Sequence, residues 1–269
     1  MPRFIDLSVT LEPGVASDPP FMLPQIEYFR HHQTADQVTS FFPGLSVDDL
    51  PGGEGWAIEK LTVWSHNGTH LDAPYHHHST MSGGARAITI DEVPLNWCFA
   101  PGVKLDFRHF PDGYVATPQD VECELRRIGH DLRPLDIVLV NTAAGERYGH
   151  EDYLTRGCGV GRAATEWMLE RGVRVTGTDA WSWDAPFSHT AKLWEQIRDP
   201  SLIWQGHRAS MTTGYCHMEK LANLDLLPAN GYMVSCFPFK IKGASAGFIR
   251  AVAILDAQQA REAEHMDAL

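Results

Sequence analysis

The chain has 269 residues, of which 43% are hydrophobic, and carries a formal net charge of −12. This length can bury a large core, and the acidic balance argues against nucleic acid or an anionic membrane as a partner. The sequence shows no basic and apolar leader, and no apolar run approaches the ~20 residues of a membrane span. Five cysteines without a Cys-x-x-Cys pair suit free thiols in a reducing compartment. We therefore expect a cytoplasmic protein that acts on a small molecule.

The first quarter of the chain is predicted to hold two strands separated by a long irregular segment. Residues 4–11 predict the first strand, which a Pro-Gly turn ends. Residues 13–55 form an irregular stretch that contains prolines and glycines, and loops of this length are usually functional or mobile. Residues 56–65 alternate as a strand does and lead directly into a cluster of histidines.

The rest of the chain mixes helices with strands, which is typical of a parallel or mixed sheet. A helix is predicted from Thr117 to Ile128, because threonine can cap its start, proline suits its first turn and acids follow. The β-branched run at 136–142 predicts a buried strand. The other predicted elements are strands at 102–107, 173–178, 232–237 and 248–255, a short connection at 91–93, a helix at 162–171, and a polar helix or frayed tail at 257–269. No linker or fixed repeat divides the sequence, so we expect one α/β domain over residues 1–269, with a mixed β-sheet core flanked by helices.

The most informative segment is HNGTHLDAPYH at residues 66–76, which contains three histidines and a carboxylate. Positions 66, 70, 72 and 76 share parity, so an extended backbone would project all four side chains to one face. Imidazole and carboxylate groups together suit zinc, manganese or iron, and three such ligands leave room for water or substrate. We therefore predict that His66, His70 and Asp72 bind a divalent metal.

Further histidines and acids raise the question of what completes this site. We interpret His77 and His78 as ordinary solvated or packed side chains, because fourteen histidines in one chain will cluster somewhere by chance. His207 and Glu219 are the best distant candidates for ligands. From the residues alone, Glu219 is explained equally well as a surface acid on a helix that follows Thr213 and Gly214.

The chain resembles the bacterial cyclase-like family of metal-dependent hydrolases, which includes kynurenine formamidases and isatin hydrolases. HNGTHLDAPYH matches the family motif H-x-G-T-H-x-D-x-P-x-H in full, and His207 followed twelve residues later by Glu219 matches a second family feature. The similarity continues through EKLANLDLLP and FPFKIKGASAGFIRAVAIL, and it spans residues 61–255. The chain departs from the family at His77, where a bulky apolar residue is common, and at 13–55, which shorter formamidases lack.

The resemblance implies a fold of the swivelling β/β/α type, a homodimer or homotetramer, and one or two divalent ions, zinc or manganese. Asp72 would bridge the two ions, and His76 is similar either to the family's catalytic base or to a histidine that supports the ligands from outside. The metal ligands that the resemblance implies are His66, His70, Asp72, His207 and Glu219.

The expected reaction is hydrolysis by metal-activated water of a C–N or C–O bond at an activated carbonyl. An amide, formamide, lactam or lactone of a small, ring-containing metabolite would be the substrate, and His76 would carry the proton from water to the leaving group. Two other functions stay open: a non-haem iron oxygenase that uses His70, Asp72 and His207, and a non-catalytic metal-binding protein.

Two more segments bear on the pocket. Residues 177–187 follow a strand and are rich in aromatic groups, which suits a wall for a planar substrate. Trp181 and Trp183 individually are better explained by packing, whereas Asp179 fits a role beside the site and a structural role equally well. Residues 243–247 match the G-x-S-x-G of serine hydrolases, but a strand follows where a helix is required, so we predict a hairpin turn.

Overall fold

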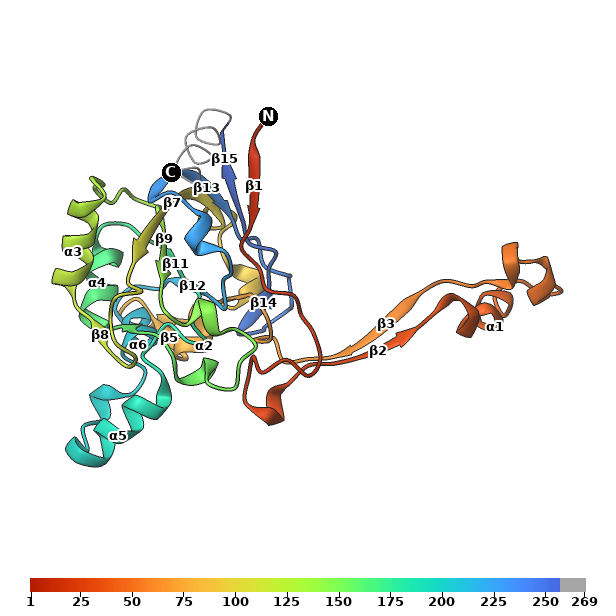
Figure 1. The fold of residues 1–269 in the computed structure, drawn as a ribbon, viewed down its shortest axis with the longest axis horizontal. Coiled ribbons are helices and arrows are strands. Elements are labelled where there is room, and N and C mark those ends of the chain that lie inside the picture. The colour runs from red at the N-terminus through yellow and green to blue at the C-terminus, as the bar shows by residue number, and fades with distance from the viewer. Residues whose placement is uncertain (257–269) are drawn as a thin grey trace.

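The computed structural model describes residues 1–256, which form a mixed β-sheet of nine strands with helices packed against it (Figure 1). The four strands β7, β9, β11 and β12 run parallel, and the remaining pairs are antiparallel. In sheet order the strands are β1 (Arg3–Asp6), β15 (Val252–Leu255), β13 (Asn230–Ser235), β7 (Phe99–Asp106), β9 (Ile137–Asn141), β11 (Val175–Thr178), β12 (Cys216–Glu219), β4 (His70–Asp72) and β14 (Ala246–Phe248). The predicted α/β class and mixed sheet are confirmed. The helix or tail predicted at 257–269 lies outside the described residues.

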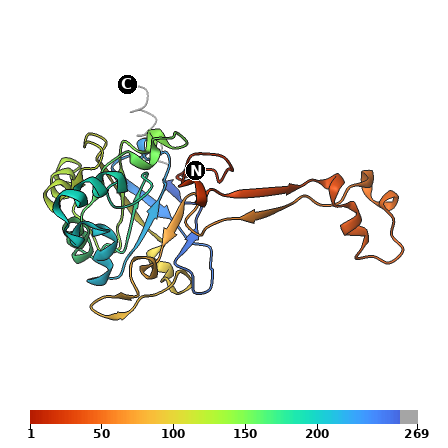
Figure 2. The same cartoon turned by 90° about the horizontal axis from the view of Figure 1, so that it is seen from below.

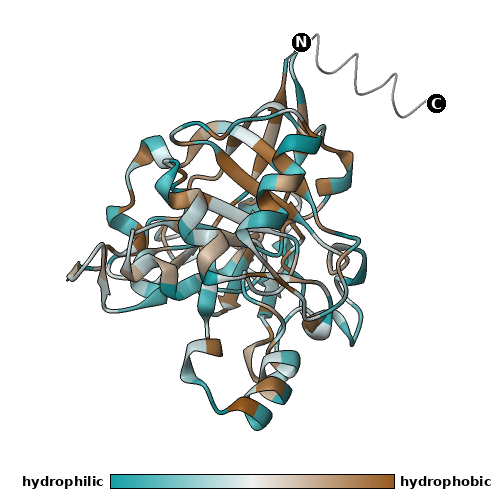
Figure 3. Cartoon of the chain, turned by 90° about the vertical axis from the view of Figure 1, so that its left-hand side faces the viewer, coloured by the Kyte–Doolittle hydropathy of each residue, from teal (hydrophilic) through white to brown (hydrophobic). Residues whose placement is uncertain are grey.

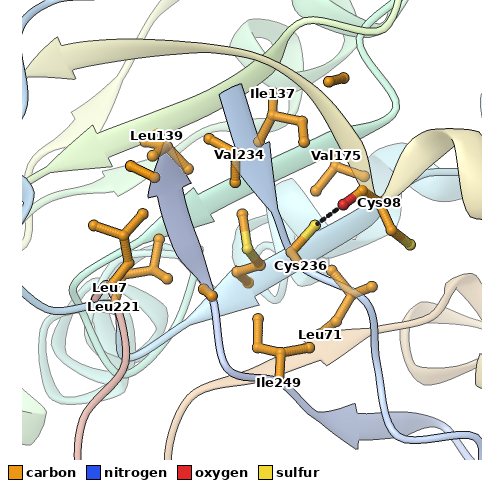
Figure 4. Close-up of a cluster of buried hydrophobic side chains, with 14 of the residues drawn as sticks. Leu7, Leu71, Cys98, Ile137, Leu139, Val175, Leu221, Val234, Cys236 and Ile249 are labelled. Atoms are coloured by element: carbon orange, nitrogen blue, oxygen red, sulfur yellow. Dashed lines mark hydrogen bonds between the residues drawn. The ribbon is translucent and has the colours of Figure 1, made fainter. Parts of the chain in front are cut away.

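Strand β9 is buried on both faces, because its alternating side chains enter two separate apolar clusters. Ile137 and Leu139 pack in the first cluster, where Leu7, Leu71 and Leu221 meet them (Figure 4). The second cluster holds Val138 and Val140 and is covered by helices α3 (Pro118–Arg127) and α4 (Arg162–Glu170). The nine-stranded sheet and the helices packed against it are called the body below. Hydrophobic residues lie along several strands of the body, and hydrophilic residues lie along many of the surrounding turns (Figure 3).

The predicted start of α3 is confirmed. Thr117 is its N-cap and accepts a hydrogen bond from the Asp120 backbone N–H, while the Asp120 carboxylate accepts one from the Thr117 backbone N–H at 2.8 Å. Other helices are α1 (Ala35–Thr39), α2 (Pro74–His77), α5 (Phe187–Ile197) and α6 (Gln205–Arg208), and short strand pairs are β5 (Thr80–Met81) with β6 (Ala85–Arg86) and β8 (Val115–Ala116) with β10 (Gly159–Val160). No helix in the described part of the chain is both long and apolar enough to cross a membrane.

An arm formed by residues 25–62 extends away from the sheet (Figures 1 and 2). Its two strands, β2 (Gln25–Phe29) and β3 (Ile58–Thr62), pair antiparallel with each other and with no strand of the main sheet, and α1 lies near the tip. The strand predicted at 56–65 therefore exists but belongs to the arm. Much of the stretch predicted as irregular, 13–55, supplies the other half of this hairpin.

The single strand predicted at 248–255 is wrong, because two strands with different partners occupy this segment. β14 pairs with β4 at one edge of the sheet, and β15 pairs with β1 and β13 near the opposite edge. Residues 243–247 therefore do not close a simple hairpin between the strands predicted on either side. An alternating pattern indicates that a segment is extended, but it does not identify the strand with which the segment pairs.

Candidate metal centre

The centre is built on two neighbouring antiparallel strands, β4 and β12. In their register His70 lies opposite Glu219, and Asp72 lies opposite His217. Leu71, between His70 and Asp72, enters the apolar cluster of Figure 4. Met218, between His217 and Glu219, belongs to the same cluster. Because side chains alternate along a strand, the histidines and carboxylates on both sides of these residues project together from the opposite face.

Asp72 lies in the middle of the resulting cluster. Its Oδ1 atom is 2.8 Å from His66 Nδ1 and 3.4 Å from His70 Nε2, and its Oδ2 atom is 3.1 Å from His217 Nε2. Glu219 closes the other side, with Oε1 3.2 Å from His217 Nε2 and Oε2 3.6 Å from His70 Nε2. Ligands held ~2.1 Å from a tetrahedral zinc ion lie about 3.4 Å from one another. The spacing of these atoms therefore fits a divalent ion between them.

Hydrogen bonding gives an independent test of this fit. Within residues 1–256, the buried atoms without a hydrogen-bond partner include His70 Nε2, both carboxylate oxygens of Asp72 and His217 Nε2. All three side chains are fully buried, and leaving such polar atoms unpaired is costly. The unpaired atoms face one another across the distances given above, so one cation would satisfy several of them at once.

The outer nitrogens of the histidines are held by other groups. His70 Nδ1 lies 2.9 Å from the Gly68 carbonyl oxygen, His207 Nδ1 contacts the Asp184 carboxylate, and His66 Nε2 lies 3.0 Å from Ser245 Oγ. Partners of this kind fix the orientation and tautomer of metal-binding imidazoles. They leave His70 Nε2, His207 Nε2 and His66 Nδ1 free to face the carboxylates.

The six predicted site residues converge, but not through one extended segment. Only residues 70–72 form a strand, and Pro74 starts the one-turn helix α2, which carries His76. His76 Nε2 comes within 3.9 Å of Asp72 Oδ2, and its ring lies 4.1 Å from that of His66. The extended backbone predicted from parity is therefore wrong on both sides of residues 70–72, since His66 lies in a turn and His76 on a helix. The proline begins a helical turn, and that turn brings His76 back to the cluster.

Glu219 lies on β12, so the alternative of a surface acid on a helix is wrong. Its Oε1 atom is 3.9 Å from His207 Nε2 and accepts a hydrogen bond from the Trp183 backbone N–H at 3.0 Å. Asp184, whose carboxylate contacts His207 Nδ1, also accepts hydrogen bonds from the backbone N–H groups of Gly206 and His207. These contacts fix the two distant residues of the site.

His217 was missed by the sequence analysis, although it stands two residues before Glu219 and shares its face of the strand. The spacing would have revealed it had this segment been read as a strand. His77, interpreted as a solvated or packed side chain, is buried and stacks on His217 with 4.7 Å between ring centroids. His78 is exposed and contacts Thr80.

Both carboxylates in the cluster are ionised at neutral pH. Burial alone would raise the pKa of Asp72, but the imidazoles of His66, His76 and His70 hold it well below its usual value. Burial likewise opposes ionisation of Glu219, yet the imidazole of His217 beside its Oε1 and other nearby charges bring its pKa to about 2. Burial would lower the pKa of His217, but the carboxylates of Asp72 and Glu219 beside its Nε2 raise it to about 9. A metal that binds here would displace that proton.

Comparison with known proteins identifies the family. Residues 5–185 match the model of the Cyclase family, described as "Putative cyclase". This chain belongs to the cyclase family. A kynurenine formamidase of Erythrobacter litoralis (strain HTCC2594) is 22% identical over 256 residues, which cover 93% of each protein. The predicted resemblance is thereby confirmed.

Solved structures of similar fold include further hydrolases. Isatin hydrolase A from Labrenzia aggregata, bound to benzyl benzoate, is 24% identical, with a TM-score of 0.72 over 94% of both chains. A potential metal-dependent hydrolase with cyclase activity is 19% identical, with a TM-score of 0.64 over 95% of this chain and 99% of the other. The cyclase-family fold is therefore shared along almost the whole length of these proteins.

A pocket of about 190 Å³ opens onto the centre of this cyclase-family chain. Trp204 stacks on His207 with 4.5 Å between ring centroids, and Trp181 packs edge-on against Phe187. All four side chains line the pocket, as do His66, His76, Glu219, Asp18, Met22, Ser182 and Lys220. The candidate metal ligands thus face a small pocket whose walls are largely aromatic.

Three residues of the other predicted segments have distinct places. Trp183 is fully buried and donates its indole N–H to Thr165 Oγ1 at 3.0 Å, as expected for a packing residue. Asp179 accepts hydrogen bonds from Asn141 and Thr142 and thereby ties the ends of β9 and β11 together, and burial raises its pKa to about 7. Ser245 contacts His66 and belongs to the surroundings of the centre.

Proposed function

We propose that this cyclase-family chain is a metal-dependent hydrolase that binds one or two divalent ions, zinc or manganese. The observation that carries the proposal is the convergence of buried, unpaired histidine nitrogens and carboxylate oxygens beside an aromatic pocket. Asp72 lies within reach of both halves of the cluster. His66 and His70 approach its Oδ1, while His217 approaches its Oδ2. A two-ion site would use Asp72 as the bridge.

We propose that the substrate is a small, ring-containing molecule with an activated carbonyl: an amide, formamide, lactam or lactone. The volume and aromatic walls of the pocket support a planar substrate. The names of the relatives support the reaction class, since one is a kynurenine formamidase and others are isatin hydrolases. The bond cleaved would be C–N or C–O.

When bound, the divalent ion supplies polarisation of the carbonyl and acidification of water. The side chains of the protein would hold the ion and position the substrate. His66, His70 and Asp72 hold one side of the centre, and Glu219 with His207 holds the other. The walls formed by the tryptophans exclude bulk water and fix the substrate ring.

We propose His76 as the general base. It lines the pocket, its ring packs at a tilt against that of His66, and its Nε2 lies 3.9 Å from Asp72 Oδ2, farther than His66 Nδ1 lies from Oδ1. Burial lowers the pKa of His76 to about 3, so the imidazole is neutral at pH 7 and can accept a proton from water. A base with this pKa is weaker than one poised near the working pH.

A substrate panel with metal removal tests the proposal. Purified protein would be assayed with N-formylkynurenine, isatin and a set of small lactones, before and after chelation and with zinc or manganese restored. We expect turnover of at least one compound that chelation abolishes and one of the ions restores. Silence across the panel, despite bound metal, would favour the alternative of a non-catalytic metal-binding protein, and iron-dependent oxygen uptake would favour the oxygenase.

We also propose that the chain assembles as a homodimer or homotetramer through the arm. The arm exposes many large apolar side chains, among them Tyr28, Phe41, Phe42, Trp56, Ile58 and Leu61. A large exposed apolar surface of this kind is typical of a protein interface. In a two-fold symmetric dimer, the same surface of each copy would contact the other. Sedimentation would compare the full chain with a variant in which an Asn-Gly turn replaces residues 30–57. We expect the full chain to sediment as an oligomer and the variant without the arm to sediment as a monomer. A full chain that sediments as a monomer would overturn the proposed assembly.

A further inference from the structure

Lys220 is a buried lysine in an unfavourable backbone conformation, directly after the proposed ligand Glu219. Its side chain is 1% exposed, and its φ of +56° lies in the left-handed region. Residues with a Cβ atom rarely adopt this region, and such strain concentrates at functional sites. Lys220 also lines the pocket beside the centre.

The contacts of Lys220 join the two halves of the centre. Its ammonium group donates hydrogen bonds to the Asp18 carboxylate and to the backbone carbonyl of His66, the latter at 2.8 Å. Its own carbonyl accepts a hydrogen bond from Thr69 Oγ1 at 2.7 Å. The segment that carries His66 is thereby tied to the end of the strand that carries Glu219.

Asp18 extends the connection to the pocket wall. Its carboxylate accepts hydrogen bonds from the Trp181 indole at 3.1 Å and from Asn67 Nδ2 at 3.2 Å, besides the Lys220 ammonium. Asn67 is the neighbour of His66 in the chain, and its side chain also donates to the Met22 carbonyl at 2.8 Å. This buried ion pair therefore contacts both the backbone carbonyl of His66, a proposed ligand, and the indole of Trp181 in the pocket wall.

Stability of the fold does not account for this pair. Both Asp18 and Lys220 are buried, and the desolvation of two charges can exceed the attraction between them. Replacement of a buried ion pair by apolar side chains of similar size often leaves stability unchanged or raises it. The strained backbone of Lys220 adds a second cost that packing does not explain.

We propose that Lys220, held by Asp18, is a positioning residue of the metal centre. It fixes the main chain of His66 and so keeps the imidazole Nδ1 beside Asp72, while Asp18 fixes Trp181 in the wall of the pocket. This inference rests on the proposed function, in which His66 is a metal ligand. Groups that orient the ligands of a metal commonly contribute ~10–100-fold to metal affinity or activity.

The test compares four variants: Lys220→Met, Asp18→Asn, the double variant Asp18→Leu with Lys220→Met, and the control Lys104→Met. Lys104 is a half-buried lysine on β7 that donates to the carbonyl oxygens of Leu224 and Leu227, so the control removes a similar group away from the centre. Zinc and manganese affinity would be measured by competition with a chromophoric chelator, and thermal unfolding would be followed without metal.

We expect Lys220→Met to lower both stability and metal affinity, because Asp18 is left buried without its partner. The double variant should be more stable than Lys220→Met, because no charge is left buried alone, but it should keep a ~10–100-fold loss of metal affinity, since no group then holds the His66 carbonyl. The control should keep the affinity of the parent protein. If the double variant does not fold, Asp18→Asn, which preserves shape, should still show weakened metal binding.

Parent-like metal affinity in every folded variant would overturn the positioning role and leave a purely structural ion pair. This outcome differs from failure of the proposed function, in which the parent protein itself binds no divalent ion or hydrolyses no compound of the panel. Because metal affinity is measured without substrate, the inference is tested even before the substrate is known. Once a substrate is identified, the fold-decrease in kcat of the double variant should exceed its fold-increase in KM.

Discussion

Strands β9 and β3 are both five residues long, yet every residue of β9 is buried and every residue of β3 is exposed. β9 lies between two parallel neighbours and beneath helices, whereas β3 pairs only with β2 in the arm. The same local conformation thus serves two purposes. In the body it builds the core that supports the metal centre, and in the arm it displays apolar side chains to the exterior.

If the arm mediates assembly as proposed, this difference separates chemistry from assembly. The proposed ligands lie on β4 and β12 and in the segments beside them, all within the body. A two-stranded hairpin such as the arm is only marginally stable alone. We therefore expect changes in the body to alter metal binding, catalysis and unfolding, and changes in the arm to alter the oligomeric state first.

Asp72→Ala should have the largest effect and tests whether the chemistry belongs to the body alone. Asp72 contacts both halves of the cluster, so its removal should abolish metal binding and reduce turnover to the uncatalysed level. Metal content by mass spectrometry and hydrolysis of the best substrate would measure this, and sedimentation should show an unchanged oligomer. Stoichiometric metal in the variant would contradict the central place of Asp72.

His76→Ala should leave the metal in place and lower kcat by about 10²-fold, the lower end of the usual contribution of a general base, because its low pKa makes it a weak base. His78→Ala is the matched control, because that histidine is exposed and two residues away. Metal content and steady-state kinetics distinguish the outcomes. Full turnover by the His76 variant would remove its assigned role, and loss of metal would make His76 a ligand.

Half of the centre was predictable because the motif is local. His66, His70 and Asp72 lie within seven residues, so their shared chemistry is visible in the sequence without knowledge of the fold. His217 was not found, because its relation to Asp72 depends on the pairing of β12 with β4. The partners of the histidines, such as Asp184, likewise become visible only when distant segments meet.

The fold was predictable to a similar extent. The capped helix at 118–127 and the apolar run at 137–141 carry local signals, namely a capping box and a series of β-branched residues. The arm and the division of 248–255 into two strands were not, because alternation does not specify a partner strand. Register and pairing are decided by burial across the whole chain, which no single segment contains.

Leu139→Ala and Leu61→Ala form a matched pair that sharpens the contrast between body and arm. Leu139 is fully buried on β9, so its truncation should lower the free energy of unfolding by about 2–5 kcal/mol. Leu61 on β3 is 51% exposed, and its truncation should change that free energy by less than about 0.5 kcal/mol. Urea unfolding measures both. The Leu61 variant should instead dissociate more readily, which sedimentation at falling protein concentration would detect.

Asp120→Ala and Asp49→Ala compare the same capping device in the two regions. The Asp120 carboxylate completes the capping box at the start of α3 on the body, and Asp49 accepts hydrogen bonds from Ser46 in the arm. Loss of the first cap should destabilise the body by about 1 kcal/mol, whereas loss of the second should leave unfolding of the body unchanged. An equal effect of both variants in urea unfolding would contradict the independence of the arm.

The contribution of Asp120 should also depend on pH with a defined sign. Burial raises its pKa, but hydrogen bonds from Thr117 and Tyr114 outweigh this and hold the pKa below the ordinary value of 3.8. The folded state therefore favours the carboxylate, and its stabilising contribution is complete above the pKa of the unfolded chain. The difference in unfolding free energy between the parent protein and Asp120→Ala should be constant at neutral pH. It should then shrink as the pH falls below about 4; a difference that grows on acidification would show that the carboxylate does not cap the helix in its ionised form.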